Sequence, residues 1–454
     1  MYYCKVKGEF VAPPAVSTAA YTTRLSTFTN QLIRLLGSAA PVSPETIVQM
    51  YKGRKRAIYE HAKLKYELVG LTRKDGWLNT FVKLEKVNPT KAPRCIQPRR
   101  PVYNLRLARF IKPVEHRIYS KIAKLFGDGP TVLKGYNVEG IGRIIRGKFN
   151  SFRNPVAIGL DATKFDMHVS LAALKWEHSI YHSMYRSREL RELLSSQLHN
   201  VGRAWCKDGH LKYSVEGRRA SGDMNTALGN CLIMCGLVYA YAKEKRIHIK
   251  LANNGDDCVV FMEREFQVRF MTGLDDWFLE MGFRMVAEPP VYTLPEIEFC
   301  QMHPIEFDDG TCRMVRNIPT ALRKDSLSTL NISSEQAMQG WMTAVGNGGL
   351  ALTGGVPIMQ NFYRCLLRNG KGVVNKMSEE LNRHSGMHLM SFDMDKVFVE
   401  PSPRVRLQVW QAWGITPDVQ AELENYFDNY LVDTGVSVVD SHTNYNTIFH
   451  ALSR

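Results

Sequence analysis

The stretch Leu251 to Phe261, LANNGDDCVVF, constrains the fold more than any other part of this sequence. Two β-prone runs flank an Asn-Gly pair, which predicts a β-hairpin with a tight turn. A turn accounts for the Asn-Gly pair, but it does not require the adjacent carboxylates of Asp256 and Asp257, which repel each other. Adjacent acids are tolerated when they share a positive partner, and a divalent metal ion is the usual one.

A second carboxylate could meet this hairpin at the edge of one sheet. The segment NPVAIGLDATKFD (154–166) contains an apolar run typical of a buried strand, and the run ends at Asp161. If that strand lies beside the hairpin, Asp161 and Asp256 face the same space and could bridge a pair of Mg²⁺ ions. Taken alone, the Gly-Asp-Asp triplet also fits a solvated turn, and Asp161 also fits a helix N-cap.

A group of polar residues suited to a ribose lies near these acids in the sequence. Asp166 follows Asp161 by five residues. Ser221 precedes a glycine that permits a mobile loop, and Thr226 and Asn230 share one face of the helix that follows. Together these side chains could hydrogen-bond a ribose 2′-hydroxyl, the group that distinguishes RNA from DNA.

The third element is a cluster of cations. Lys83 and Lys86 lie three residues apart on a strand predicted over 77–87, and Lys91 and Arg94 follow an Asn-Pro turn. These side chains could hold a triphosphate and neutralise a departing pyrophosphate. A plain contact with RNA is the alternative for the same residues.

The net charge of +15 and pI near 9.3 suggest a polyanionic partner, either nucleic acid or an acidic membrane surface. The charge is concentrated: residues 52–100 hold 14 Lys/Arg and 4 Asp/Glu, a net of +10, whereas residues 418–454 hold 1 base and 6 acids, a net of −5. The basic surface therefore belongs mainly to the N-terminal third.

The nine cysteines are scattered without a CxxC pair, which indicates reduced thiols rather than a disulfide framework. The first residues lack the apolar core of a signal peptide. The longest apolar run, residues 231–242, is too short to span a bilayer, which takes about 20 residues. We therefore expect any membrane association to come from a partner or a missing segment.

The coarse pattern predicts several elements. A helix should begin at Ser43-Pro44-Glu45 and run to Leu68 before Gly70. Residues 169–200 are predicted to form an amphipathic helix, and a second hairpin is expected around Asp308-Asp309-Gly310. From about residue 326 the pattern is mostly helical.

Taken in order, these segments resemble the motifs of viral RNA-dependent RNA polymerases of the tombusvirus-like group, the Tombusviridae, which includes carmoviruses and umbraviruses. The resemblance covers residues 75–320 most closely. The matching segments are VKLEKVNPTKAPRCIQPRRPVYN (82–104, motif F), GPTVLKGYNVEGIG (129–142, motif G), IGLDATKFDMHVS (158–170, motif A), SGDMNTALGN (221–230, motif B), NNGDDCVVF (253–261, motif C) and IEFCQ (297–301, motif E).

The resemblance implies an α+β fold, a closed right hand with fingers, a palm built on an antiparallel sheet flanked by helices, and a mostly helical thumb. The implied parts are an N-terminal segment (1–42), mainly fingers (43–152), palm (153–310) with an inserted fingers portion near 180–220, and thumb with an acidic C-terminal tail (311–454).

The resemblance also implies a role for each candidate residue. Asp161 and Asp256 would be metal ligands, with Asp257 as an accessory ligand. The ribonucleotide would be selected by Asp166 and Asn230, helped by Ser221 and Thr226. The remaining residues fall at the nucleotide channel (Lys83, Lys86, Lys91, Arg94) and near the priming end (Cys300, Gln301).

The implied reaction is replication of a positive-strand RNA virus genome: transfer of a nucleoside monophosphate to a 3′-hydroxyl, started without a primer. The implied cofactor is Mg²⁺, with Mn²⁺ as a substitute. The implied partners are template and nascent RNA, ribonucleoside triphosphates and a viral auxiliary replication protein. The expected location is the host cytoplasm, at membrane-bound replication complexes.

Two departures from the group's pattern stand out. The segment GFRMVAEPP (282–290) places Val286 where the group usually has a lysine that protonates the departing pyrophosphate, so no general acid is assigned. Many members also carry an upstream replication protein that supplies the membrane anchor, so this chain could be the downstream part of a longer product. Two rival interpretations are a reverse transcriptase and an RNA-binding replication subunit without activity.

Overall fold

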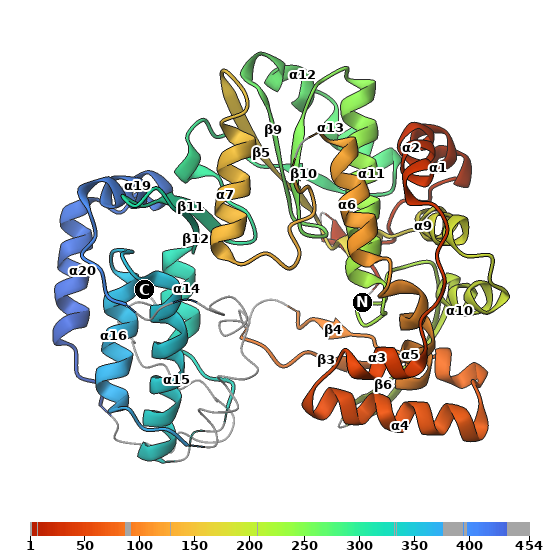
Figure 1. The fold of residues 1–454 in the computed structure, drawn as a ribbon, viewed down its shortest axis with the longest axis horizontal. Helices are drawn as coiled ribbons and strands as arrows, with labels where there is room; N and C mark the ends of the chain where they lie inside the picture. The colour runs from red at the N-terminus through yellow and green to blue at the C-terminus, as the bar shows by residue number, and fades with distance from the viewer. Residues whose placement is uncertain are drawn as a thin grey trace. The chain divides into compact units, whose positions relative to one another are not determined.

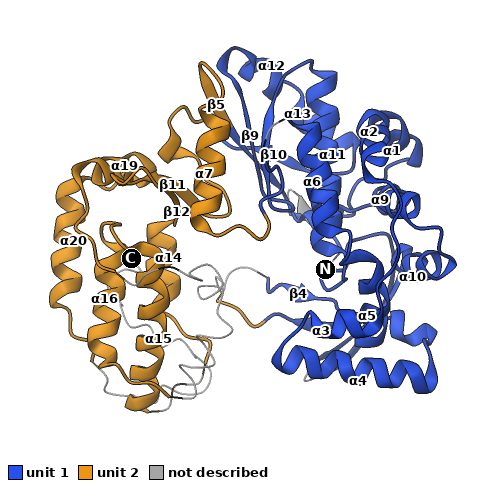
Figure 2. Ribbon diagram, in the orientation of Figure 1, with its two compact units in different colours: residues 1–83, 92–133, 158–290 blue, residues 84–91, 134–157, 291–454 orange. Residues whose placement is uncertain are grey.

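The structure is a computed structural model that describes residues 2–433, apart from residues 7, 87–91, 128, 207, 331, 333, 376–393 and 395–396. Its helices and sheets form two compact units (Figure 2). The first unit contains residues 1–83, 92–133 and 158–290, and the second contains residues 84–91, 134–157 and 291–454. The mixture of helices and sheets confirms an α+β protein, whereas the predicted finger, palm and thumb boundaries stay a prediction.

The central sheet of the first unit has the strand order β10-β5-β9-β8 (Figure 1). Its strands are β5 (Pro155–Ala162), β8 (Lys250–Asn253), β9 (Cys258–Glu263) and β10 (Met285–Ala287). The pairs β8–β9 and β10–β5 are antiparallel, and the buried strand and the hairpin predicted from sequence are both confirmed. The continuous apolar run of β5 is buried on both faces of the sheet, since Val156, Ala157 and Ile158 are all buried.

Helix α11 (Thr226–Glu244) is buried along most of its length, because apolar residues occupy all of its faces. It contacts β8 and the helices around it, which are α2 (Ser26–Leu36), α9 (Leu171–Met184) and α13 (Leu274–Glu280). Helix α1 (Thr18–Arg24) packs on α9, and α6 (Glu115–Leu125) packs on α2. The small elements of this unit are β1 (Cys4–Val6), β2 (Glu9–Val11), α8 (Phe165–His168) and α12 (Gln267–Met271).

A second sheet of the first unit joins strands that lie far apart in sequence. Its order is β4-β3-β6-β7, with β3 (Leu78–Val82), β4 (Cys95–Ile96), β6 (His199–Cys206) and β7 (Gly209–Glu216). The pair β3–β6 is parallel, and the other two pairs are antiparallel. Helix α5 (Pro101–Ile111) follows β4 and contacts α3 (Pro44–Gln49), α4 (Gly53–Val69) and α10 (Arg188–Leu198).

Two predicted helices are each divided in the structure. The helix expected over 43–68 starts as predicted, since Ser43 accepts from the Thr46 N–H, but it is split into α3 (Pro44–Gln49) and α4 (Gly53–Val69). Gly53 adopts a φ of +55°, which a continuing helix does not allow. Residues 169–200 form α9 and α10 (Arg188–Leu198), because the Ser187 hydroxyl caps a new helix start.

The second unit is mainly helical around one β-hairpin. Strands β11 (Met302–Glu306) and β12 (Cys312–Arg316) form the hairpin predicted around Asp308-Asp309-Gly310, and helix α7 (Val138–Phe149) packs on β12. The helices that follow are α14 (Ile318–Asp325), α15 (Glu335–Thr353), α16 (Met359–Gly370), α19 (Pro403–Trp413) and α20 (Pro417–Asn429). Their core includes Trp341, Phe362, Val409 and Phe427. Of the six acids in the segment 418–454, five lie in the described part of the chain, and Asp440 lies outside the described residues.

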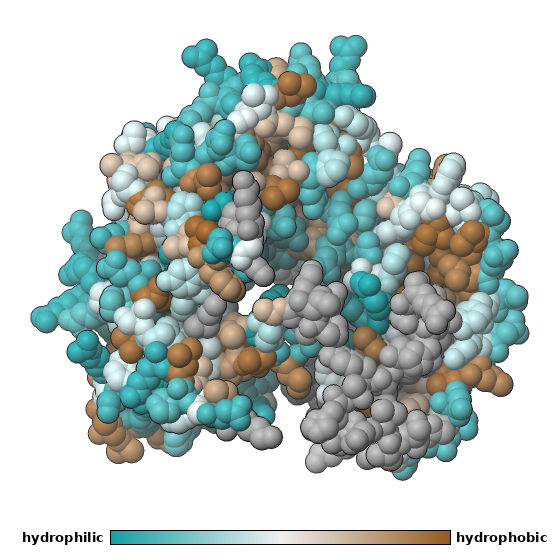
Figure 3. Space-filling view, turned by 180° about the vertical axis from the view of Figure 1, so that it is seen from behind, coloured by the Kyte–Doolittle hydropathy of each residue, from teal (hydrophilic) through white to brown (hydrophobic). Residues whose placement is uncertain are grey.

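No disulfide forms among the cysteines whose side chains the structure describes. On the face drawn in Figure 3, hydrophobic residues form separate patches among hydrophilic side chains.

Among the described helices, none combines the length and the apolar character needed to cross a bilayer.

Candidate active site

The turn between β8 and β9 projects Asp256 from the edge of the central sheet. Buried Asn253 holds the turn, since its side chain donates to the Gly255 carbonyl at 2.7 Å and accepts from the Gly255 N–H at 3.1 Å. Gly255 has a φ of +97°, a conformation that strongly favours glycine. The chain then places Asp256 in an exposed position, while Asp257 is half-buried.

The structure brings Asp161 to the same end of the sheet. Asp161 is exposed near the end of β5, and β5 lies next to β9. The buried Cys258 thiol follows Asp257 at the start of β9. Burial raises the pKa of this thiol, and the carboxylates of Asp257, Asp256, Glu288 and Asp161 raise it further. Because such effects come from nearby charges, they agree with the position of Asp161 and Asp256 on neighbouring strands of the sheet.

This pair of acids suits a divalent cation. Within the described ranges, neither Asp161 nor Asp256 accepts a hydrogen bond or forms an ion pair, so their charges are not neutralised by the chain. No group of three His, Cys, Asp or Glu side chains placed to hold a metal occurs among the described residues. Mg²⁺ commonly uses one or two carboxylates and completes its shell with water and substrate phosphates, and the donor set fits that behaviour.

Asp166 and Asn230 are in direct contact, as the ribose-binding hypothesis requires. Asn230 Nδ2 donates to Asp166 Oδ1 at 2.8 Å. Burial raises the pKa of the Asp166 carboxyl, the Asn230 hydrogen bond lowers it, and Asp256 raises it. Asp166 lies in α8, which starts three residues after β5 ends, and this position near Asp161 agrees with the influence of Asp256 on the Asp166 carboxyl.

Arg219 and Glu177 support this pair, and sequence analysis missed both. Arg219 Nε donates to Asn230 Oδ1 at 3.0 Å, and Arg219 Nη2 pairs with the carboxylate of Glu177. Both charged side chains are fully buried. Glu177 lies in α9, 42 positions before Arg219 in the sequence, so no local pattern joins them. The one available signal was an ionisable residue on the apolar face of a predicted helix.

The hydroxyls of Ser221 and Thr226 are engaged within the loop that precedes α11. Ser221 Oγ donates to the Cys95 carbonyl at 3.4 Å, and Thr226 Oγ1 donates to the Ala220 carbonyl at 2.8 Å. A Cβ at Gly222 would lie 2.5 Å from Pro98 Cα, so this glycine allows a close approach of two backbones. Gly222 was predicted to make the loop mobile, and the structure adds a packing role against Pro98.

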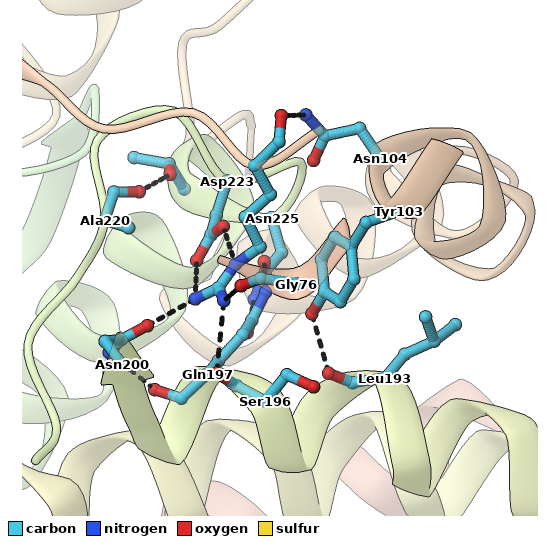
Figure 4. A network of polar contacts seen from close by, with 12 residues as sticks. Gly76, Tyr103, Asn104, Leu193, Ser196, Gln197, Asn200, Ala220, Asp223 and Asn225 are labelled. Atoms are coloured by element: carbon cyan, nitrogen blue, oxygen red, sulfur yellow. Dashed lines mark hydrogen bonds and ion pairs between the residues drawn. The ribbon is translucent and has the colours of Figure 1, made fainter. Parts of the chain in front are cut away.

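Buried Arg99 fixes this loop to the rest of the unit. Its partners Asp223, Asn200, Ser196 and Gly76 are labelled in Figure 4. Arg99 Nε donates to Asp223 Oδ1 at 2.6 Å, and Arg99 Nη1 donates to the Ser196 carbonyl at 3.1 Å. Its other contacts are with the Asn200 side chain and the Gly76 carbonyl. Arg99 lies within the basic segment of the sequence, whose spacing does not predict this pairing.

The predicted cations do not all share one environment. The strand predicted over 77–87 ends at Val82, so the placement of Lys83 and Lys86 on it was wrong. Lys83 is exposed, and its N–H donates to the carbonyl of exposed Arg94 at 2.8 Å. The Lys86 ammonium donates to the Lys324 carbonyl within the second unit, near the end of α14. Lys91 lies outside the described residues.

The priming-end candidates form a tight turn. Phe299 and Met302 exchange backbone hydrogen bonds, and the two residues between them, Cys300 and Gln301, have φ of +54° and +59°. This is the backbone of a type I′ hairpin turn, here without glycine. Gln301 Oε1 lies 3.5 Å from Lys324 Nζ.

Comparison with known sequences gives a consistent set of similarities. The family model described as viral RNA dependent RNA polymerase matches residues 1–435. The RNA-directed RNA polymerase of Oat chlorotic stunt virus is 41% identical over 452 residues, 96% of this chain and 60% of that protein. That of Turnip crinkle virus is 43% identical over 413 residues, 89% of this chain and 53% of that protein. The chain spans about half the length of such curated relatives.

Proposed function

Because this chain belongs to the family of viral RNA-dependent RNA polymerases, we propose that it catalyses template-directed RNA synthesis during replication of a positive-strand viral genome. The observation that supports this most strongly is the convergence of Asp161 and Asp256 around Cys258, with Asp166 beside them. The proposed fold is a right hand with fingers, palm and thumb, and initiation is proposed to need no primer.

The acids would hold two Mg²⁺ ions, or Mn²⁺ in their place, with Asp161 and Asp256 as main ligands and Asp257 as an accessory. When bound, such ions favour deprotonation of the attacking 3′-hydroxyl and stabilise the charge of the leaving pyrophosphate. The chain's own part is to keep these carboxylates exposed and close together. The buried Asn253 contact with Gly255 supplies the rigid turn that this requires.

The remaining candidates would orient the nucleotide. Asp166 and Asn230 would bind the ribose 2′-hydroxyl, with Ser221 and Thr226 shaping the loop beside them. Lys83 and Arg94 are exposed next to each other and suit a triphosphate, and Lys86 and Lys91 are proposed for the same channel. The Cys300–Gln301 turn is proposed to support the priming end.

The net charge of +15 supports template and nascent RNA as the polyanionic partners. Ribonucleoside triphosphates are the proposed substrates. We also propose an auxiliary viral replication protein, and attachment to membranes through a partner or upstream segment, in replication complexes of the host cytoplasm.

The test is RNA synthesis by the purified chain with a short heteropolymeric RNA, four ribonucleotides and Mg²⁺. Wild type is compared with Asp256→Asn, which keeps the side-chain size but removes the charge. Asp308→Asn is the matched control, because Asp308 is also an exposed acid followed by a second aspartate in a hairpin turn. The proposal predicts complementary RNA from wild type and the control, and none from Asp256→Asn.

Three other results would contradict the proposal. If Asp256→Asn made as much RNA as wild type, the Asp256 carboxylate would not be required for the reaction. If all three proteins bound RNA and none of them made RNA, the result would favour an RNA-binding subunit without activity. Preferred use of deoxynucleotides would favour the reverse transcriptase.

A further inference from the structure

We infer that Arg219 is a positioning residue that orients Asn230 for selection of ribonucleotides, an inference that rests on the proposed function. Three residues form a continuous chain of hydrogen bonds. Arg219 Nε donates to Asn230 Oδ1 at 3.0 Å, and Asn230 Nδ2 donates to Asp166 Oδ1 at 2.8 Å. Neither the sequence motifs nor the proposed nucleotide contacts include Arg219.

The chemistry of the two neighbours permits only one orientation of the Asn230 amide. A guanidinium can only donate hydrogen bonds, and an ionised carboxylate can only accept them. Rotating the amide by 180° would place its NH₂ against the guanidinium and its oxygen against the carboxylate, so both bonds would be lost. Arg219 therefore directs the NH₂ of Asn230 toward Asp166.

Arg219 is itself held from several sides. Its backbone N–H donates to the Asp166 carbonyl at 2.9 Å, and its Nη2 pairs with buried Glu177. Glu177 also accepts from Asn225 Nδ2 and from the Tyr181 hydroxyl, each at 2.8 Å. Arg219 thus contacts Asp166 through its backbone and Asn230 through its side chain, which fixes the spacing between the two.

Stability alone is a poor explanation for this arginine. Burying an ion pair carries a desolvation penalty that often equals its Coulombic gain. Arg219 Nη1 is also buried without a hydrogen-bond partner in the part of the chain that the structure describes. A lysine could neutralise Glu177, but its ammonium lacks the planar fork that serves Glu177 and Asn230 at once.

The hydrogen bonds among Arg219, Asn230 and Asp166 leave one carboxylate oxygen of Asp166 for the nucleotide. Asp166 Oδ1 is occupied by Asn230, whereas Oδ2 accepts no hydrogen bond from a described residue. A ribose 2′-hydroxyl could donate to Oδ2, and the oriented Asn230 amide lies beside it. Without the Arg219 bond the amide can rotate, so recognition of the 2′-hydroxyl should weaken while the metal-binding acids stay unchanged.

The experiment measures single-nucleotide incorporation by the full chain, as kcat/KM for a ribonucleotide and for the matching 2′-deoxynucleotide. Arg219→Lys keeps a positive charge beside Glu177. The double variant Glu177→Gln/Arg219→Gln leaves no unpaired buried charge, so it keeps the test valid if Arg219→Lys folds poorly. Arg406→Lys is the control, since Arg406 forms a comparable pair with Glu424, with both contacts at 3.0 Å, in the second unit.

We expect the ribose preference to fall about tenfold in both Arg219 variants, mainly through a higher KM for the ribonucleotide, and to stay unchanged in Arg406→Lys. The inference is overturned if folded Arg219 variants keep the wild-type preference, or if both substrates lose efficiency equally, which a merely structural role predicts. An inactive wild type would instead reject the proposed function, and this inference with it.

Discussion

Val286 lies directly opposite Asp161 in the antiparallel register of β10 and β5. The Val286 side chain is 53% exposed, and Asp161 is exposed as well. Side chains at opposite positions of such a pair have Cβ atoms about 5 Å apart and share one face of the sheet. A charge at position 286 would therefore act directly on a proposed metal ligand.

Val286→Lys should raise the Mg²⁺ concentration needed for half-maximal RNA synthesis, by about threefold, because the new ammonium competes with the cation for Asp161. Val286→Thr keeps the β-branched shape and should leave the Mg²⁺ requirement unchanged. A titration of activity against Mg²⁺ measures both. An unaltered requirement in Val286→Lys would show that position 286 does not face the metal site.

Gly229→Ala should destabilise the protein by about 2 kcal/mol, because its Cβ would lie 2.3 Å from Arg219 Nη2 and 2.4 Å from Glu177 Oε1. Gly147→Ala is the matched control, since Gly147 is also helical and has open space around its Cβ position. That control should be neutral or slightly stabilising, because alanine favours helices. Thermal unfolding of both variants provides the comparison, and a stable Gly229→Ala would contradict the tight packing.

His178 should make stability depend on pH below about 6.5. Burial lowers its pKa from the ordinary 6.5 to about 4, and its ring nitrogen lies 3.2 Å from Gln197 Oε1. Between these two values the unfolded chain binds a proton that the folded chain excludes, so the free energy of unfolding falls as the pH drops. The loss attributable to His178 between pH 7 and pH 5 should be about 2 kcal/mol.

The check is the unfolding free energy of wild type and His178→Gln at both pH values. The variant should lose about 2 kcal/mol less than wild type on acidification. His210→Gln, which changes an exposed histidine, should behave like wild type. Equal acid sensitivity of all three proteins would exclude His178 as the cause.

The sequence predicted what local patterns determine. The β8–β9 hairpin follows from an Asn-Gly turn between β-prone runs, and β5 follows from its apolar run, so the meeting of Asp161 with Asp256 was predictable. The Asp166–Asn230 contact was predictable too, because the ribose-binding hypothesis placed both side chains at one hydroxyl. In each case, residues within a few positions in the sequence form the pattern that predicts the element.

The rest depends on contacts between distant residues. Arg99 pairs with Asp223 across 124 positions, and Arg219 pairs with Glu177 across 42, so neither pairing leaves a periodic pattern. The Lys86 contact with the Lys324 carbonyl joins residues 238 positions apart, and the strand predicted to include Lys86 ends at Val82. These contacts depend on tertiary packing, so local propensity does not predict them.

The most direct test of the shared metal site is Mn²⁺ binding, followed by electron paramagnetic resonance, to the chain with template RNA and a non-hydrolysable nucleotide. We predict that Asp161→Asn and Asp256→Asn each weaken binding about tenfold or more, and that the double variant is scarcely weaker than either one. Asp308→Asn should bind as wild type does. If Asp256→Asn bound Mn²⁺ as tightly as wild type, the two aspartates would not share a cation, and the account of this site would be wrong.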